Sequence, residues 1–397
     1  MNMIKQKKPK IPSIDDSITI LIICCQSKHS KIEHDFLLNY FSQGSYTFQH
    51  ILNLASKHGV LPLVYQSIHH MANTHHILKP FEMTLKSAYL QIVKKNMRMS
   101  IELIYITKLL KTHGIDSLTF KGPVLSKIAY GDITLRQYGD IDILIKKRDR
   151  LKMILLLENE GYIPEIQLKT HTKETFIKAV NVIAFYHKSS KIRIEIHWEL
   201  LSKNYAVNWH EDTLWENNHS IQINNNHLPI LTIELHLIYL CVHSAKHLYE
   251  RIEWICDIDR LIRSNANIDW NYILYHSKKM GITRMLYLGL TLSYILFDLE
   301  IPNTVQKHIN KDTEIPKLIN KIIKINFSNT SKSKKGFYIF RLLLNMRENH
   351  ADKVKLFYKG ITTAKFDDFL FLQLPKPLTF LYPIVRLFRL IKKYSKL

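Results

Sequence analysis

Two aspartates separated by a single residue are the clearest chemical signal in this sequence. Asp140 and Asp142 flank Ile141 at the start of an apolar run that ends at Ile145. Alternate side chains of a β-strand point to one face, so a strand here would hold both carboxylates together. Two like charges repel each other, and a fold that keeps them close usually supplies a cation; all-oxygen ligands favour Mg²⁺. The same pattern also occurs on exposed strands without a ligand, but the apolar neighbours favour a metal site.

A third carboxylate is available on a second predicted strand, residues 191–199. The polar side chains of this segment that would share one face are Arg193, Glu195, His197 and Glu199. If this strand lies beside the first, Glu195 joins the two aspartates as a third acidic group. A register shifted by two residues would bring Glu199 there instead.

A turn precedes the aspartates in the chain. Lys121-Gly122-Pro123 separates a predicted strand, residues 117–120, from a predicted helix that ends near Tyr130. Proline suits the first turn of a helix, where its missing N–H is not needed. The 11 glycines include no G-x-G and no Walker A spacing, which excludes the P-loop and the Rossmann dinucleotide site. A nucleotide would therefore have to be bound by another kind of site.

A polar and aromatic stripe follows later in the chain. At helical spacing, the side chains that fall within a sector of about 120° are His243, His247, Arg251, Trp254 and Asp257. The histidine pair reads H-S-A-K-H, and the missing glutamate of H-E-x-x-H argues against a zinc protease. The stripe either faces a ligand cleft or consists of paired polar groups at a helix interface.

Taken together, these residues resemble the bacterial nucleotidyltransferase family 5, a family of uncharacterised nucleotidyltransferases in the DNA polymerase beta-like superfamily. The resemblance spans roughly residues 50 to 262 and is looser from there to the end. The motifs that carry it are Leu54-Ala55, His58-Gly59-Val60, Pro62-Leu63, Lys121-Gly122, Tyr130, Arg136, Asp140-Ile141-Asp142, Glu195-Ile196-His197-Trp198, His243, Lys246-His247, Arg251, Trp254 and Asp257.

The resemblance implies a Mg²⁺-dependent enzyme that moves a nucleoside monophosphate from an NTP such as ATP to an acceptor hydroxyl and releases pyrophosphate. It implies that Asp140, Asp142 and Glu195 hold two Mg²⁺ ions, with Glu195 also a candidate to accept the hydroxyl proton. The residues expected to contact the nucleotide are Lys121, Gly122, Ser126, Arg136, His243, His247 and Arg251. Arg136 could instead hold the loop before Asp140 by an ion pair. The acceptor is left open among a small molecule, a peptide, a saccharide and an RNA.

Two residues depart from the superfamily pattern. Pro123 follows Gly122 where glycine or serine is usual, which removes one backbone N–H donor to phosphate. Glu195 stands where aspartate is common, and its extra methylene still permits metal ligation. Two other functions remain open: a catalytically degenerate protein that binds a nucleotide or a partner, and a toxin that nucleotidylates transfer RNA. The three carboxylates argue against the first, and the absence of a recognisable RNA-binding motif argues against the second.

The strands and helices predicted around these residues indicate an α+β fold that is mostly helical. A small mixed sheet with the nucleotidyltransferase core is expected to lie between N-terminal and C-terminal helical regions. The predicted core contains strand 117–120, the helix that ends near Tyr130, strand 141–145, helix 148–160 and a hairpin of strands 180–186 and 191–199. Helices are predicted at 88–113, at 232–263 as one or two, and at 282–297. The expected regions are 1–114, 115–200, 201–327 and 328–397, with a linker at 328–335.

Charge and cysteine usage add expectations about location and partners. The net charge is +22, and residues 302–397 hold 20 Lys and Arg against 6 Asp and Glu. The basic tail helix could pack its apolar face on the protein, lie on an anionic membrane, or line a groove for RNA; we expect the first, with only weak polyanion binding. Four cysteines without metal spacing, no signal peptide and no apolar run long enough to span a bilayer predict a cytoplasmic protein.

Overall fold

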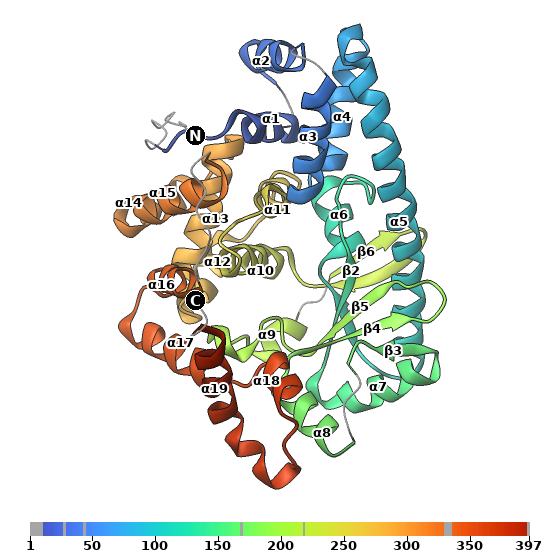
Figure 1. The fold of residues 1–397 in the computed structure, drawn as a ribbon, viewed down its shortest axis with the longest axis vertical. Coiled ribbons are helices and arrows are strands. Elements are labelled where there is room, and N and C mark those ends of the chain that lie inside the picture. Colours follow the sequence, from blue (N-terminus) through green and yellow to red (C-terminus); the bar gives the residue numbers. More distant parts are fainter. Residues whose placement is uncertain are drawn as a thin grey trace.

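A seven-stranded mixed sheet forms the centre of the computed structural model (Figure 1). The structure describes residues 11–26, 29–42, 45–166, 170–216, 219–328 and 336–394. The strand order is β3-β4-β5-β2-β1-β7-β6, in which β2 pairs with β5 and β1 with β7 in parallel, and the other neighbours are antiparallel. The strands are β1 Ser117–Thr119, β2 Asp140–Ile145, β3 Tyr162–Pro164, β4 Val182–His187, β5 Arg193–His197, β6 His219–Ile223 and β7 Asn226–Ile230.

The α+β, mostly helical fold predicted from the sequence is confirmed, and so are strands β1 and β2 and the β4–β5 hairpin. The β6–β7 hairpin was not predicted; it extends the sheet to Ile230, beyond the expected core limit at residue 200. Its turn carries Asn224 and Asn225 at positive φ, a conformation that asparagine tolerates. Apolar residues alternate on both sides of this Asn-Asn pair, a signal that could have identified the hairpin. The division into four regions stays a prediction.

Helices cover both faces of the sheet. The N-terminal and central helices are α1 Asp16–Cys25, α2 Lys31–Phe41, α3 Ser45–His58, α4 Leu61–Ala72, η1 His76–Leu78, α5 Lys79–Thr112, α6 Gly122–Tyr130, η2 Lys147–Asp149, α7 Arg150–Asn159, α8 Thr170–Ala179, η3 Lys203–Tyr205 and α9 Glu211–Trp215. Figure 1 shows the long helix α5 running along one side of the sheet and α10 to α13 on the other. The later helices of this second side are α10 Ile233–Lys246, α11 Ile252–Arg263, α12 Trp270–Lys279, α13 Thr283–Phe297, α14 Asn303–Lys311 and α15 Glu314–Asn326.

The alternation along β2 divides its side chains between two cores. Ile141, Ile143 and Ile145 pack in the core that includes Met99 and Leu103 of α5, while Leu144 belongs to the other core, with α10 and α13. Asp140 and Asp142 are in phase with Leu144, so both carboxylates face the helices of the second side. Burial of the isoleucines on the opposite face fixes this orientation, because a shift of one residue would put them in water.

Helices α10 and α11 are separate, which settles the open choice between one helix and two. Leu248 and Tyr249 both have positive φ, and the Tyr249 N–H donates to the Ser244 carbonyl as α10 ends. The predicted stripe assumed one continuous helix and is wrong in that respect, since the chain reverses between His247 and Arg251. None of the helices in the described part of the chain is long and apolar enough to cross a membrane.

The C-terminal region consists of α16 Gly336–Asn345, α17 His350–Thr362, α18 Phe366–Phe371, η4 Lys376–Leu381 and α19 Tyr382–Tyr394. The expectation that α19 packs its apolar face on the protein holds for only part of that face, since Tyr382 and Val385 are buried in the core. Leu387, Phe388 and Ile391 are exposed, while Arg386 is buried and pairs with the buried Asp368. Leaving a fully buried carboxylate without a cation costs more free energy than leaving an apolar side chain exposed. The predicted linker at 328–335 lies outside the described residues except for Ser328.

Candidate active site

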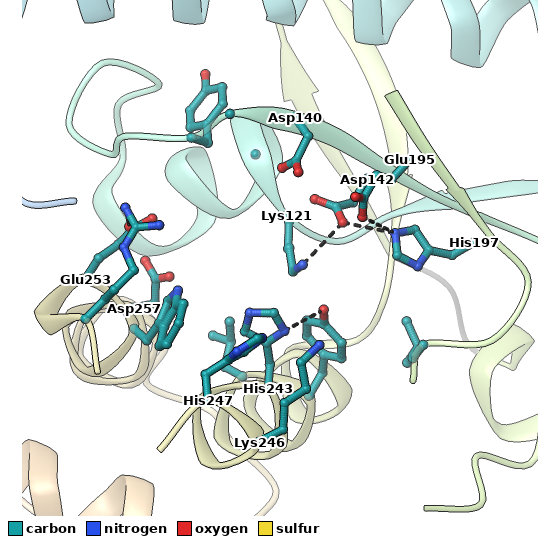
Figure 2. A pocket seen from close by; sticks show the side chains of 18 of the residues that line it. Lys121, Asp140, Asp142, Glu195, His197, His243, Lys246, His247, Glu253 and Asp257 are labelled. Carbon is teal, nitrogen blue, oxygen red and sulfur yellow. Dashed lines mark hydrogen bonds and ion pairs between the residues drawn. The ribbon is translucent and has the colours of Figure 1, made fainter. Parts of the chain in front are cut away.

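The predicted carboxylates meet at one end of neighbouring strands. In the parallel pairing of β2 and β5, Asp140 lies opposite Arg193 and Asp142 opposite Glu195. All four side chains lie on the face that turns toward α10, and the three carboxylates line a cavity of about 610 Å³ (Figure 2). Glu199 lies beyond the end of β5 and pairs with Lys147 at 2.9 Å. The register therefore selects Glu195 over Glu199 as the neighbour of the two aspartates.

Asp142 is almost fully buried and has two cationic neighbours. Lys121 Nζ lies 3.2 Å and His197 Nε2 3.1 Å from its Oδ1, while its Oδ2 is buried without a partner. Burial alone would raise the pKa of Asp142, but Lys121 and His197 hold it below its usual range. His197 Nε2 also lies 3.3 Å from Glu195 Oε2, and the pKa of Glu195 is lowered to about 2 by this histidine against the effect of burial.

Asp140 has a different environment. Its Oδ2 lies 3.0 Å from Arg193 Nη1, and Arg193 also contacts Glu195 and Glu165. Burial, together with the charges of Asp142 and Glu195, raises the pKa of Asp140 to about 6. Three carboxylates therefore face Lys121, His197 and Arg193. This is the balance expected where clustered anions require cations.

The donor set at this end of the sheet fits a divalent cation. Asp142, Glu195 and His197 each offer a ligand atom, and these atoms lie within 4.8 Å of one another. The buried, unpartnered Oδ2 of Asp142 is an oxygen that only a donor or a cation would satisfy. Asp140 adds a carboxylate on the same face, so all-oxygen ligation through three carboxylates is also available. His197 was placed on this face by the sequence alternation but was not assigned a role; the strand position was the signal that could have found it.

The glycine turn lies beside the aspartates. Gly122 has a φ of +54°, and a Cβ there would lie 3.3 Å from the carbonyl oxygen of Asp140. Both the conformation and the close approach require glycine at this position. Lys121 is partly buried, and its pKa is raised by Asp142 against the effect of that burial, so its ammonium stays charged inside the cavity. Pro123 occupies the first turn of α6 as predicted.

Ser126 is the predicted nucleotide contact that the structure does not bring to the cavity. Its side chain is buried, and its hydroxyl donates to the Asp132 carbonyl at 2.8 Å. That bond fixes the turn that follows α6. Because α6 points this face inward, Ser126 shapes the loop that leads to Asp140 and does not line the cavity.

Arg136 lines the cavity, but its charge is used within the protein. Its Nε and Nη2 donate to the two carboxylate oxygens of Asp257 at 2.8 and 2.9 Å, and Nη2 also lies 2.9 Å from Glu253. The Tyr130 hydroxyl donates to Asp257 as well, at 2.8 Å. Of the two roles predicted for Arg136, the ion pair that holds the loop before Asp140 is the one the geometry favours. The carboxylates that hold it lie on α11.

The opposite wall of the cavity is made by α10 and the start of α11. The His243 and His247 rings lie 5.0 Å apart, and the Trp254 ring lies 5.6 and 5.0 Å from them. Burial lowers the pKa of His243 well below its usual value and that of His247 to about 4, so both rings are neutral. Arg251 Nη2 lies 2.9 Å from Glu253, and its guanidinium is 5.8 Å from the Trp254 ring.

Lys246 and Tyr239 complete this wall and were not assigned roles from the sequence. Burial lowers the pKa of Lys246 to about 8, with Lys121 acting in the same direction. The Tyr239 hydroxyl lies 3.3 Å from His243 Nδ1. Figure 2 shows Lys121 between the carboxylates of the sheet and the histidines and Lys246 of α10. The cavity thus has an acidic wall on the strands and a basic, aromatic wall on the helices.

A second hollow of about 440 Å³ opens next to the first. The two share Asn181, Val182, Glu195 and Ser202 in their linings. The further side chains of the second hollow include Phe176, Arg193, Lys365 and Phe366. Glu195 therefore faces two spaces, one beside the aspartates and one lined by aromatic and cationic groups.

Two solved structures are similar to parts of this chain. One is a lincosamide antibiotic adenylyltransferase, LnuA, with lincomycin bound; it is 18% identical, the match covers 34% of this chain and 82% of that one, and the TM-score is 0.24. The other is an antigenic nucleotidyltransferase-like protein from Paracoccidioides brasiliensis; it is 13% identical, the match covers 64% of this chain and 95% of that one, and the TM-score is 0.29. A comparison with curated proteins finds no match.

The family is established by the sequence itself. Residues 45–298 match the model of a family described as uncharacterised nucleotidyltransferase. This segment holds the glycine turn, the three carboxylates of the sheet and the α10–α11 wall, and it covers more than half of the chain. The chain belongs to this family of nucleotidyltransferases.

Proposed function

We propose that the protein transfers a nucleoside monophosphate from an NTP to an acceptor hydroxyl in a Mg²⁺-dependent reaction that releases pyrophosphate. The observation that carries this proposal is the placement of Asp140, Asp142 and Glu195 on one face of β2 and β5, with a buried Asp142 oxygen left unpartnered. These carboxylates adjoin a cavity of about 610 Å³ whose opposite wall carries cationic and aromatic side chains.

Asp140, Asp142 and Glu195 are the residues that would hold two Mg²⁺ ions, with His197 as an additional ligand or as a hydrogen-bond partner of the carboxylates. When bound, the ions would supply charge stabilisation for the attacking and leaving oxygens of the phosphoryl transfer. In the structure Arg193 pairs with Asp140 and Glu195, and it would have to give up part of these contacts when the ions bind. The three carboxylates together favour Mg²⁺ because it prefers oxygen ligands.

The basic wall is suited to a triphosphate. Lys121 stays charged within the cavity, and Lys246 on α10 adds a second ammonium. Neutral His243 and His247 can each donate one hydrogen bond, and Trp254 offers a ring surface on which a base can stack. Gly122 lets the turn approach the phosphates closely, although Pro123 supplies no N–H.

The acceptor would enter from the second hollow, because Glu195 is shared by both spaces. The ionised carboxylate of Glu195 can accept a hydrogen bond from an acceptor hydroxyl and orient its oxygen toward the nucleotide. Phe176 and Phe366 offer apolar contacts, and Arg193 and Lys365 offer charge. This lining favours an acceptor with an apolar or ring part beside its hydroxyl.

The test is a measurement of pyrophosphate release with each NTP, with and without Mg²⁺, in the presence of cell extract and a labelled nucleotide. Label transferred to an extract component only with Mg²⁺ and NTP supports the proposal. The Asp140→Asn/Asp142→Asn variant is the control for contaminating activity. If wild-type protein and this variant release pyrophosphate equally, the assignment of the site is wrong.

A second candidate, a protein that binds a nucleotide without transferring it, is favoured by two observations. Arg193 occupies the carboxylates in the way a metal would, and Pro123 removes a phosphate donor from the turn. Nucleotide binding that is independent of Mg²⁺, with no product from any extract, would identify this function. A transfer-RNA acceptor, weak polyanion binding and a cytoplasmic location stay predictions.

A further inference from the structure

The C-terminal helix α19 exposes a stripe of apolar side chains, while Tyr382 and Val385 on its other side are buried. Ile384, Leu387, Phe388 and Ile391 occupy positions i, i+3, i+4 and i+7, and they are 51%, 47%, 64% and 57% exposed. This spacing makes one continuous stripe on a helix. Exposed leucine, isoleucine and phenylalanine side chains are individually ordinary, but a stripe of four on one helix face is a surface that favours burial.

Buried ion pairs fix this orientation. Arg386 is 4% exposed; it donates to the Gly360 carbonyl and pairs with Asp368, which is 0% exposed. Arg389 pairs with Asp368 and with Asp367. Rotating α19 to bury its apolar stripe would pull both arginines away from a fully buried carboxylate, which is strongly unfavourable. The protein therefore holds the stripe on its surface.

Neighbouring elements add exposed apolar side chains. The Lys392 ammonium of α19 lies 5.6 Å from the ring of Phe371, which is itself 47% exposed at the end of α18. The other exposed apolar residues of α18, the segment that follows it, and η4 are Phe366, Leu370, Leu372, Leu378 and Phe380. We call α18, η4 and α19 with these side chains the C-terminal face; Figure 1 shows its elements together at one end of the molecule.

Charge decides between the surfaces that could cover this face. Residues 366–394, which form the C-terminal face, carry 5 Lys and Arg against 2 Asp, and Lys392 follows Ile391 of the stripe directly. A second copy of the chain would bring two such basic regions together and would be repelled. A nucleic acid would leave the apolar stripe unused, and Arg386 and Arg389 already point inward. An anionic lipid surface satisfies both features, because apolar side chains enter the acyl boundary while lysines remain near lipid phosphates.

We propose that the C-terminal face docks the protein on an anionic membrane surface, with the stripe of α19 lying in the interface plane. This inference does not depend on the proposed nucleotidyl transfer. It does place the second hollow near the lipid, since Phe366 is the first residue of α18 and also lines that hollow beside Glu195. An acceptor dissolved in or attached to the membrane would reach the site from there.

The test is flotation of the full chain with vesicles of phosphatidylcholine, alone or with phosphatidylglycerol. We expect binding to the anionic vesicles that persists at moderate salt, because salt screens the lysines and leaves apolar insertion in place. The variant Leu387→Ser/Phe388→Ser/Ile391→Ser should lose at least about tenfold in vesicle partitioning. All three positions are exposed, so the thermal unfolding midpoint should not fall.

The matched control is Met83→Ser/Met97→Ser on α5, where the side chains are 72% and 52% exposed but lie away from the C-terminal face. This variant should bind vesicles as the wild type does. Three outcomes would overturn the proposal: no binding to either vesicle, binding that the α19 variant retains and salt abolishes, or a concentration-dependent dimer that only the α19 variant disrupts. The last would identify a second copy as the occupant.

Discussion

The two walls of the active-site cavity are built on different kinds of scaffold. The acidic wall stands on β2 and β5, where backbone register sets Asp142 against Glu195. The basic and aromatic wall stands on α10 and α11, and its side chains converge because the chain reverses at Leu248 and Tyr249. The acidic wall can be predicted from the spacing of residues along a strand, whereas the basic and aromatic wall depends on how α10 and α11 pack. Substitutions in each wall and in the ion pairs between them test this difference.

The largest effect is expected at the aspartates. Asp140→Asn and Asp142→Asn should each lower nucleotidyl transfer by on the order of a thousandfold or more, because each removes a charge that holds the cation. Their stabilities should differ. Asp140→Asn removes repulsion with Asp142 and Glu195 and should leave the unfolding midpoint unchanged or higher. Asp142→Asn takes a partner from Lys121 and His197 and should lower it.

Pyrophosphate release and thermal unfolding measured on both variants check this pair of expectations. An equal decrease of the unfolding midpoint in both variants would mean that Asp140 stabilises the fold as much as Asp142 does. Wild-type turnover in either variant would remove that aspartate from the catalytic set.

The second experiment concerns the link between the walls. Arg136→Met should cost about 3–5 kcal/mol of unfolding free energy, because it leaves the buried carboxylate of Asp257 without its cation and takes one of two cations from Glu253. Arg251→Met is the matched control, since this arginine also pairs with Glu253 but is 35% exposed; we expect a loss below about 1 kcal/mol. Urea unfolding measures both. A stable Arg136→Met protein with only a raised KM for NTP would assign Arg136 to phosphate binding.

The third experiment tests the register of the acidic wall. Glu195→Gln should lower turnover on the order of a hundredfold while NTP binding persists, because this carboxylate faces the reacting end of the site. Glu199→Gln should leave turnover within about twofold, since Glu199 pairs with Lys147 outside the cavity. Steady-state kinetics and NTP titration separate the two effects. A reversed order would show that Glu199, and not Glu195, lies beside the aspartates, so that β5 does not pair with β2 in the observed register.

The smallest effect is a pH dependence of the basic wall. Lys246 is charged below its pKa of about 8 and neutral above it, so NTP affinity should weaken severalfold as pH rises from 7.5 to 9. Lys246→Met should bind more weakly at pH 7.5 and show a flatter profile across this range. His243 and His247 stay neutral here because burial lowers their pKa values. Isothermal titration checks this, and an unchanged slope in Lys246→Met would exclude Lys246 from triphosphate binding.

The sequence predicted the acidic wall well and the basic wall in part. The D-x-D spacing, the glycine turn and the β4–β5 hairpin were sufficient for the carboxylates, because side-chain direction in a strand follows from a period of two. His197 lay in the predicted pattern, yet only its distances to Asp142 and Glu195 gave it a role. Ser126 was misplaced because a helix position near a glycine turn does not reveal which side of the helix is buried.

What the sequence determined by itself is therefore local: which strands alternate, where helices begin, and that the carboxylates share a face. Tertiary structure decided what each polar face meets. Arg136 pairs with Asp257 and Glu253, which lie more than a hundred residues later in the chain. Arg386 pairs with Asp368, and α19 therefore presents Leu387 and Phe388 to the outside. An amphipathic pattern shows that two faces of a helix differ. Which face is packed depends on the charge that another element buries against it, because an unpaired buried carboxylate is far more unfavourable than an exposed apolar side chain.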